Sequence, residues 1–454
     1  MTDLNQVLDL FQRLDVGRMH YDAKNFELSS KMFESALDLD PKNVLALTNL
    51  ATIHFQAKQL AAAKYRLGQV FEIDPDNAKA MGLTAQIAQE ERNWDMADTY
   101  FRRSLNYDHN SVTALINYAY FLQLMGDYEA ASKVYTRIRD VAPMDFSARH
   151  WRSMSLMTVA ETQAEWDEAL SEYEIRHLLV GTQNIYGKPQ YHKQDPHGRT
   201  ILLVAEQGVG DAVMFGRYAR YFSSLGAAVD VICRPPLVDL MKRIDGVKCV
   251  ASDVKDLPPY DYWLPMMSSL QVTGFPAVKA DNSPYLEIDS NNSEIIPSNR
   301  RIRIGLCWKG NPEHGNDRYR SMEGNTFCEH FRHLDADFFS LLQTKDNTDK
   351  PDFVYECSIG SLTDLADTIA SMDLVVSVDT AQVHIAGAMG VPVFMASHSN
   401  VDWRWGVKGQ RDKDWYPSLT IFKNAAPLDW RQTMLDIMQA VQGFIDSKNK
   451  AAFL

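Results

Sequence analysis

The sequence lacks the features that mark secreted, membrane-spanning and disulfide-stabilised proteins. Its 454 residues include only five cysteines, which are far apart and form no Cys-x-x-Cys pair. An odd, scattered set of cysteines argues against a disulfide framework and favours a reducing compartment. No run of about 18 apolar residues is present, and the first residues carry acidic rather than basic side chains. We therefore expect no transmembrane segment, no signal peptide and a cytoplasmic location.

Positive charge is also scarce. The chain has 46 Lys and Arg against 59 Asp and Glu, which gives a net charge of −13. That balance disfavours a nucleic-acid partner, and an anionic ligand would need a local cluster of positive charge. The chain is too long for one hydrophobic core, so we expect about three domains or lobes.

A repeat with a period of 34 residues organises the first part of the chain, where Pro41, Pro75 and Pro143 lie at intervals of 34 and 68 residues. Three aligned columns resemble the tetratricopeptide repeat, in which two antiparallel helices pack through small residues. The resemblance covers residues 10–145 as four repeats, and we assign residues 1–179 to a repeat solenoid. Two columns are small and one is bulky: Gly17, Ala51, Ala85 and Ala119; Ser29, Ala63, Ala97 and Ala131; Phe33, Leu67, Phe101 and Tyr135.

An α/β pattern follows the Gly- and Pro-containing stretch 180–199, which we interpret as a linker. Short apolar strands alternate with helical segments in two blocks, which predict Rossmann-like lobes at 200–295 and 296–454, the second ending in an amphipathic helix. The expected fold class is therefore α + α/β, with a cleft between two lobes joined near 289–300. Ligands of such sheets bind at the carboxyl ends of the strands.

The stretch SVDTAQVHIAGAMGVP, residues 377–392, predicts a strand, a turn and a helix. Asp379 and Thr380 stand at the helix start, where free N–H groups and the helix dipole favour an anion. His384 lies one turn further on the same side. A phosphate-bearing ligand suits this place. The alternative is a buried crossover whose Asp and Thr only cap the helix.

The turn EQGVGD, residues 206–211, also joins a strand to a helix. Val213 stands where a dinucleotide fingerprint needs its third glycine, so an NAD site is disfavoured. Asp211 would face the cleft, where its carboxylate could take a proton from an acceptor hydroxyl. Helix capping is the alternative role. The neighbouring cleft residues are Gln207, Gly208 and Gly210.

The loop WKGNPEHGNDRYRS, residues 308–321, gathers positive charge after a strand of the second lobe. It is not a P-loop, because Asn316 and Asp317 occupy the Lys and Ser/Thr positions. The loop could bind a diphosphate through its basic side chains, or it could be a solvated surface loop. The donor-binding candidates of this loop are Lys309, Asn311, Arg318 and Arg320.

Two further patterns, a pair of tryptophans and a group of Cys and His residues, could belong to a site. Trp403 and Trp405 follow a strand and could floor a base or a sugar, or could simply pack between the lobes. Cys328, His330 and His333 show no fourth ligand, so we predict no metal site.

Taken in order, EQGVGDAVMFGRYA, CWKGNPEHGNDRYRS, DLVVSVDTAQVHIAGAMGVPV and DWRWG resemble the tetratricopeptide-repeat glycosyltransferases of bacteria. Their catalytic halves are similar to the ADP-heptose lipopolysaccharide heptosyltransferases and have the GT-B fold. The resemblance covers residues 10–430. It implies that Asp211 is the base of an inverting transfer, and that Asp379, Thr380 and His384 contact the nucleotide diphosphate.

The sequence thus predicts a metal-independent, inverting hexosyl- or heptosyltransferase. Lobe 200–295 would hold the acceptor and lobe 296–454 the nucleotide sugar, which is a substrate, so no cofactor is expected. The repeats would present a protein or glycan acceptor, and they are compatible with an oligomer. The alternative is a non-catalytic repeat scaffold with a nucleotide- or glycan-binding GT-B domain, because capping and phosphate binding use the same residues as catalysis.

Overall fold

The computed structural model describes residues 4–180, 187–274, 283–288, 301–407 and 411–452. Its contacts divide the chain into two compact units. The first comprises Met1–Gln123 and Ala130–Arg149, and the second comprises Leu124–Glu129 and His150–Leu454. The expected junction at 289–300 lies outside the described residues.

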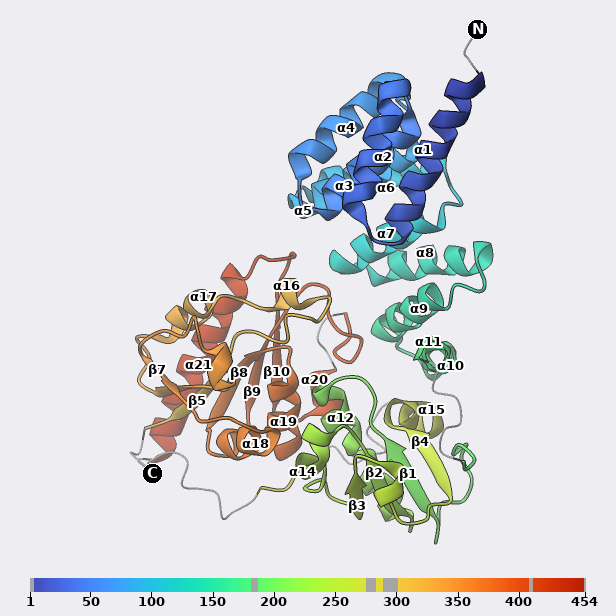
Figure 1. Cartoon of the computed structure of the whole chain (residues 1–454). Coiled ribbons are helices and arrows are strands. Elements are labelled where there is room, and N and C mark those ends of the chain that lie inside the picture. The colour runs from blue at the N-terminus through green and yellow to red at the C-terminus, as the bar shows by residue number, and fades with distance from the viewer. Residues whose placement is uncertain (1–3, 181–186, 275–282, 289–300, 408–410, 453–454) are drawn as a thin grey trace. The chain divides into compact units, whose positions relative to one another are not determined.

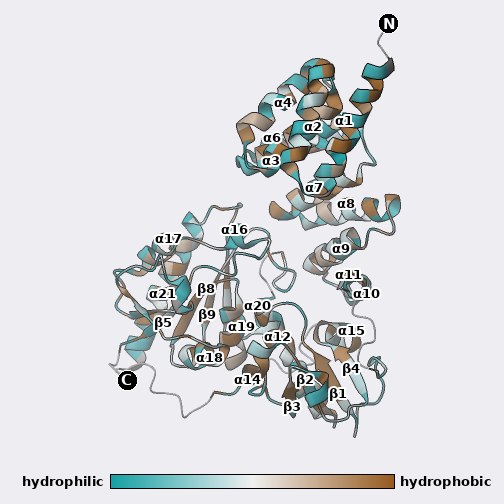
Figure 2. Ribbon diagram, in the orientation of Figure 1, coloured by the Kyte–Doolittle hydropathy of each residue, from teal (hydrophilic) through white to brown (hydrophobic). Residues whose placement is uncertain are grey.

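The first unit is a series of antiparallel helix pairs (Figure 1). Asn side chains begin several of these helices, since each accepts a hydrogen bond from the third backbone N–H, as Asn25 and Asn43 do. Hydrophilic and hydrophobic residues alternate along them (Figure 2). The helices are α1 (Leu4–Asp22), α2 (Phe26–Leu39), α3 (Val44–Gln56), α4 (Leu60–Ile73), α5 (Ala78–Glu90), α6 (Trp94–Tyr107), α7 (Val112–Leu124) and α8 (Tyr128–Val141).

The three repeat columns form the contacts between these helices. Every member of the small and bulky columns is buried. A Cβ atom added to Gly17 would lie 2.9 Å from the ring of Phe33, so the small column makes room for the bulky one. The tetratricopeptide-repeat prediction is therefore confirmed in its packing as well as in its period.

Three helices follow the repeats: α9 (Phe146–Val159), α10 (Gln163–Tyr173) and α11 (Arg176–Val180). Trp166 and Tyr173 of α10 are buried in the main core of the second unit. By its contacts, the chain from His150 onward therefore belongs to the second unit. The assignment of 1–179 to a repeat domain stays a prediction.

The first lobe of the second unit contains a parallel sheet in the order β3-β2-β1-β4. Residues of the expected linker run along it, since Gln190 forms a parallel bridge with Trp263. The elements are β1 (Thr200–Val204), α12 (Val209–Gly216), α13 (Tyr218–Ser224), β2 (Ala228–Ile232), α14 (Val238–Met241), β3 (Cys249–Ala251), β4 (Tyr262–Pro265) and α15 (Ser269–Thr273).

The second lobe contains a parallel sheet in the order β10-β9-β8-β5-β6-β7. This is the Rossmann order, and the first lobe repeats its first four strands. The elements are β5 (Arg303–Cys307), α16 (Asp317–Arg320), α17 (Gly324–Cys328), β6 (Asp337–Ser340), β7 (Val354–Glu356), α18 (Leu362–Ala370), β8 (Leu374–Val378), α19 (Ala381–Met389), β9 (Val393–Ser397), α20 (Asp412–Trp415), β10 (Leu419–Lys423) and α21 (Arg431–Ala452).

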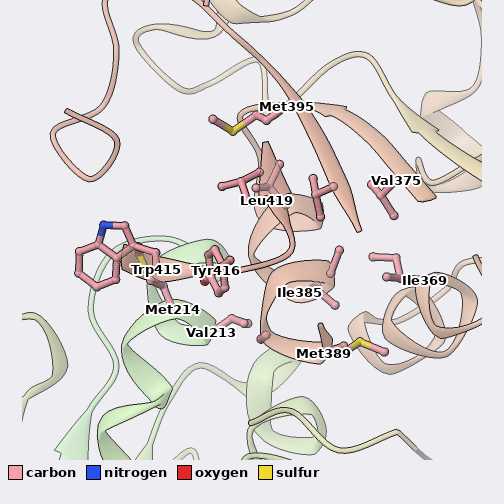
Figure 3. Packing of buried hydrophobic residues seen from close by; sticks show 14 of the residues in the cluster. Val213, Met214, Ile369, Val375, Ile385, Met389, Met395, Trp415, Tyr416 and Leu419 are labelled. Atoms are coloured by element: carbon pink, nitrogen blue, oxygen red, sulfur yellow. The ribbon is translucent and has the colours of Figure 1, made fainter. Parts of the chain in front are cut away.

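One hydrophobic core runs through both lobes. Val213 and Met214 of α12 lie beside Trp415 and Tyr416, while Ile385 of α19 faces the second sheet (Figure 3). Helices α12 and α19 pack against each other. The predicted fold class, an α-solenoid followed by a GT-B pair of α/β lobes, is confirmed.

The described part of the chain contains no helix that is long and apolar enough to cross a membrane. All five cysteines lie in this part, and the structure pairs none of them.

Candidate functional site

The N-terminus of α19 lies at the switch point of the second sheet, where β5 and β8 are neighbours and their loops diverge. Thr380 is the N-cap residue, but its side chain makes no capping hydrogen bond. Its hydroxyl instead donates to the carbonyl of Val378 at 3.2 Å and lies 3.1 Å from Ser377 Oγ. The first N–H groups of the helix thus have no side-chain cap, which leaves this end suited to an anion.

Asp379 precedes the cap and is held from two sides. Its carboxylate accepts a hydrogen bond from Trp405 Nε1 at 3.0 Å, and its carbonyl accepts one from Arg320 Nη1 at 2.8 Å. Burial, reinforced by the charge of Asp402, raises the pKa of Asp379 to about 6. This carboxyl can therefore change its charge near neutral pH.

His384 connects the second lobe to the first. Its Nδ1 lies 3.1 Å from the hydroxyl of Tyr416, and its ring stacks on Trp405 at 5.5 Å between centroids. A Cβ atom added to Gly210 would lie 2.6 Å from His384 Cδ2. Burial, with the charge of Arg404, lowers the pKa of His384 to about 3, so the imidazole is neutral.

Asp211 occupies the first turn of α12, at the carboxyl end of β1. Its Oδ2 accepts the backbone N–H of Gly208 at 2.8 Å, so the carboxylate closes its own helix start. Its Oδ1 accepts a hydrogen bond from Arg404 Nη2 of the second lobe. The predicted base and the predicted capping role thus fall on the same side chain.

Arg404 is buried, with a side-chain exposure of 6%. Its Nη1 donates to Asp402 Oδ1 at 2.7 Å, and its guanidinium lies 4.6 Å from the centre of the Trp403 ring. Nε is buried and has no hydrogen-bond partner in the described part of the chain. Although burial opposes the charged form, Asp402 and Asp211 raise the pKa of Arg404.

In the loop of residues 308–321, Arg320 contacts the residue before α19, whereas Lys309 pairs with a carboxylate elsewhere in the second lobe. Arg320 reaches Asp379, and its Nε donates to Asp317 at 3.1 Å. Lys309 instead donates to Asp349 at 2.8 Å. Burial raises the pKa of Asp349, but the hydrogen bonds from Lys309, Gly324 and Trp308 outweigh burial and lower this pKa below its ordinary value.

Two donor candidates lie at the exposed part of this loop. Asn311 accepts the backbone N–H of Glu313 at 3.1 Å, and Arg318 stacks on the ring of Tyr319 at 4.6 Å. The described contacts bring neither side chain to the start of α19. Their role in donor binding stays a prediction.

The two tryptophans are packing residues in this structure. Trp403 is 2% exposed and Trp405 is fully buried, so neither presents a free ring face. Trp403 packs near Trp166, Tyr173, Phe215 and Trp415. Trp405 contributes to the site in a different way, because it orients Asp379 and His384.

Gln207 has a positive φ of 56°, which turns the chain between β1 and α12. Its side chain donates to the hydroxyl of Tyr173 at 3.0 Å. The preceding Glu206 accepts two hydrogen bonds from Arg176 at 3.2 Å. The turn between β1 and α12 is thus fixed by α10 and α11, a support that no local sequence pattern predicts.

No group of three or more His, Cys, Asp or Glu residues with the arrangement of a metal site occurs among the described residues.

Arg404, Asp402 and Tyr416 are the site residues that sequence reasoning missed. Arg404 and Asp402 stand in the run DWRWG, in which only the two tryptophans were predicted to belong to a site. An Arg flanked by two aromatic residues at the end of a strand is the signal that could have found them.

Two segments match known family models. Residues 20–87 match the tetratricopeptide repeat, and residues 353–397 match glycosyltransferase family 9 (heptosyltransferase). The second match runs from β7 to β9 and includes Asp379, Thr380 and His384. Both matches agree with the division of the chain into repeats and α/β lobes.

Two known proteins show sequence similarity to the chain. Over 477 residues the chain is 22% identical to Protein FlbA of Caulobacter vibrioides, covering 95% of this chain and 78% of that protein. Over 99 residues it is 27% identical to Stress-induced-phosphoprotein 1 of Caenorhabditis elegans, covering 20% of this chain and 31% of that protein.

Solved structures are more distant. A mutant O-GlcNAc transferase of Thermobaculum terrenum is 14% identical, with a TM-score of 0.33, and the match covers 88% of this chain and 89% of that one. The MamA protein is 16% identical, with a TM-score of 0.29, and covers 37% of this chain and 91% of that one. At TM-scores this low, the two likenesses support no conclusion about this chain.

The chain therefore joins tetratricopeptide repeats to a two-lobed α/β half. That half resembles the family 9 glycosyltransferases, as the sequence motifs implied. Glycosyl transfer is the general class of reaction that the family match supports.

Proposed function

We propose that the protein is an inverting glycosyltransferase that moves a sugar from a nucleotide-sugar donor to a protein or glycan acceptor without a metal ion. The observation that carries the proposal is the start of α19. It has no side-chain cap, it lies at the switch point of the sheet, and Arg320 approaches it directly.

The donor diphosphate fits this place on physical grounds. The N-terminal N–H groups and the helix dipole favour negative charge, and Arg guanidinium groups pair well with phosphate oxygens. The same groups would stabilise the charge that develops as the nucleoside diphosphate leaves, which is the role that a metal plays in other transferases. Lys309 could join them only by sharing or leaving its contact with Asp349.

Asp211 is placed to serve the acceptor. It belongs to the first lobe, while its ion-pair partner Arg404 belongs to the second, so it stands where the two substrates would meet. In the proposed reaction the acceptor hydroxyl bonds to the anomeric carbon and the bond from that carbon to the diphosphate breaks. The hydroxyl proton passes to Asp211.

The remaining assignments belong to the same proposal. Gly208 and Gly210 form the acceptor-side turn, and the repeats present the acceptor, alone or in an oligomer. A cytoplasmic location would keep the five unpaired cysteines reduced.

The first experiment combines binding with turnover on the full chain. Melting curves with ADP, GDP, UDP and CMP should identify the nucleotide, since a ligand at 100 times its dissociation constant adds about 2.7 kcal/mol of stability. The matching nucleotide sugars are then supplied with a panel of protein and glycan acceptors in EDTA. We expect transfer in EDTA.

Two results would contradict the proposal. Binding without hydrolysis or transfer across the panel would favour the non-catalytic scaffold. Activity lost in EDTA and restored by manganese would contradict the metal-independent mechanism.

A further inference from the structure

Arg404 crosses the boundary between the lobes at the place where the proposed reaction occurs. We propose that Arg404 exchanges partners during the reaction, pairing with Asp211 before the donor binds and with the donor diphosphate afterwards, so that donor binding releases the base. The inference rests on the proposed function and adds Arg404 as a positioning residue, which holds Asp211 until the donor binds.

The position of Arg404 favours a contact with the diphosphate. The next residue, Trp405, donates to the carboxylate of Asp379 and stacks on His384, which are both in or beside the first turns of α19. The charge of Arg404 is close enough to influence both of those groups. Arg320 donates to the carbonyl of Asp379, so one guanidinium group contacts this helix end and the charge of a second, Arg404, acts on it.

Arg404 also has an unused donor. Its Nε is buried and lacks an acceptor among the described residues, although its two terminal nitrogens are bonded to Asp211 and Asp402. A buried donor without a partner is unfavourable. A diphosphate offers several oxygens to the planar fork of donors that an Arg side chain presents.

The surrounding carboxylates show which partner should leave. Asp402 is tied to Arg404 twice, because it also accepts the backbone N–H of Arg404 at 3.0 Å. Asp211 is tied once, and its side chain is 20% exposed. When Arg404 leaves, the hydrogen bond from Gly208 still holds Asp211 in place. Asp211 is therefore the partner that can be exchanged without losing its position.

The exchange has a chemical consequence. While Arg404 donates to Asp211 Oδ1, that oxygen is occupied. When Arg404 turns to the diphosphate, Oδ1 is free to accept a hydrogen bond from the acceptor hydroxyl at the moment when the donor is present. The acceptor hydroxyl is then deprotonated only opposite an occupied donor site.

The proposal is tested by calorimetric titration of the full chain with ADP, GDP, UDP, CDP and inorganic pyrophosphate. Because Asp211 competes with the diphosphate for Arg404, Asp211→Asn should tighten binding of the preferred nucleotide by about 10-fold, equivalent to about 1.4 kcal/mol. Arg404→Gln should weaken it by a similar factor, and Arg404→Lys should recover part of the loss. In an Arg404→Gln background, Asp211→Asn should have no effect.

Two controls separate this effect from a general loss of negative charge. Asp239→Asn removes an exposed carboxylate of the first lobe whose partner is Lys242 rather than Arg404, and it should leave the affinity within about twofold. The nucleoside without phosphates should show no gain with Asp211→Asn.

Each outcome decides between the two proposals. If the parent protein binds a nucleotide and Asp211→Asn leaves its affinity unchanged or weaker, the exchange is wrong and the proposed function stands. If no nucleotide binds to the parent or to any variant, both are wrong. If Arg404→Gln does not fold, the response to Asp211→Asn still decides.

Discussion

At the scale of single residues, the site is built from ionisable groups that the protein holds away from their ordinary behaviour. Burial keeps His384 neutral and raises the pKa of Asp379 to about 6. Such perturbed groups are frequent where chemistry or binding occurs, although structural networks also produce them. The distinction can be tested one residue at a time.

The first test concerns turnover. Asp211→Asn keeps the size of the side chain and its capping oxygen but cannot take a proton, so kcat should fall by about 100-fold or more. Melting curves on the same samples show whether the variant is folded. A folded variant that transfers sugar at the parent rate would remove Asp211 from the mechanism.

The second test concerns Asp379 and pH. Its pKa is raised to about 6, so the folded protein binds the proton more tightly than the unfolded chain does. The stability from this group is present below an ordinary pKa of about 4 and is lost as the pH rises through 6. Asp379→Asn should therefore stabilise the protein at pH 8, on the order of 2 kcal/mol, and change little at pH 4.

Thermal melts at the two pH values measure this effect. Asp335→Asn is the matched control, because Asp335 is exposed and pairs with Arg301 on the surface. It should shift both melts by the same small amount. A pH-independent effect of Asp379→Asn would mean that burial of its charge is not what the substitution relieves.

Asp211, Asp379, Thr380 and His384 could be predicted as candidates because each stands in a short strand-turn-helix motif. Arg404 could not be predicted in this way, because the partner of that residue is 193 positions away, and only closure of the two lobes brings them together. The pairing of Lys309 with Asp349, 40 positions away within the second lobe, is not marked by any local pattern either.

At the scale of elements, the contact between α12 and α19 depends on a small residue. Gly210 faces His384 at a distance that leaves no room for a methyl group. Gly387, on α19, faces the ring of Tyr416, where an added Cβ would lie at 2.5 Å. Close packing of the two helices therefore sets the orientation of His384.

Gly210→Ala should displace His384 from Trp405 and weaken binding of the preferred nucleotide by about 10-fold. The gain in helix propensity, roughly 1 kcal/mol, partly offsets the loss of stability. Gly315→Ala is the matched control, since no atom lies within 4 Å of its added Cβ. Equal affinities for the two variants, measured by titration, would show that the contact is not needed for binding.

Most strands were predicted from their apolar runs, but β6 was not. Its sequence, DFFS, begins with a charge and is only four residues long. Asp337 is nevertheless 5% exposed and pairs with Arg301 at 3.0 Å. Helices α12 and α13 are separated at Arg217, whose buried side chain donates to the carbonyl of Met214 at 2.9 Å.

At the scale of the molecule, the second unit buries neutral histidines. Burial lowers the pKa of His384 to about 3 and that of His398 to about 4. In the unfolded chain both return to an ordinary value near 6.5, so the unfolded state binds more protons below that pH. Their contribution is present above pH 6.5 and is lost as the pH falls towards 4.

We therefore expect the melting temperature of the second unit to fall between pH 6.5 and pH 4.5, with each histidine contributing on the order of 2 kcal/mol at pH 5. His398→Asn should reduce the slope of stability against pH. Calorimetric melts across this range, on parent and variant, provide the measurement. A slope unchanged by His398→Asn would contradict the assignment.

The overall architecture was the most predictable property. A period of 34 residues and buried columns such as Phe33, Leu67 and Phe101 are enough to define a solenoid, and alternating strands and helices are enough to define the lobes. The limit of the solenoid was less readable, because Trp166 and Tyr173 keep an apolar helical pattern while packing into the core of the second unit.

The turn between α7 and α8 carries a practical consequence for exchanging modules between related proteins. Residues Leu124–Glu129 belong to the second unit, where Ser399 donates to the carbonyl of Leu124 and Tyr128 donates to that of Val401. A chimaera that takes a foreign solenoid up to residue 149 would discard these anchoring donors and acceptors. A junction placed in the loop between α6 and α7 would keep these contacts. The first three repeats could then be exchanged as a unit, while the fourth repeat would have to be retained.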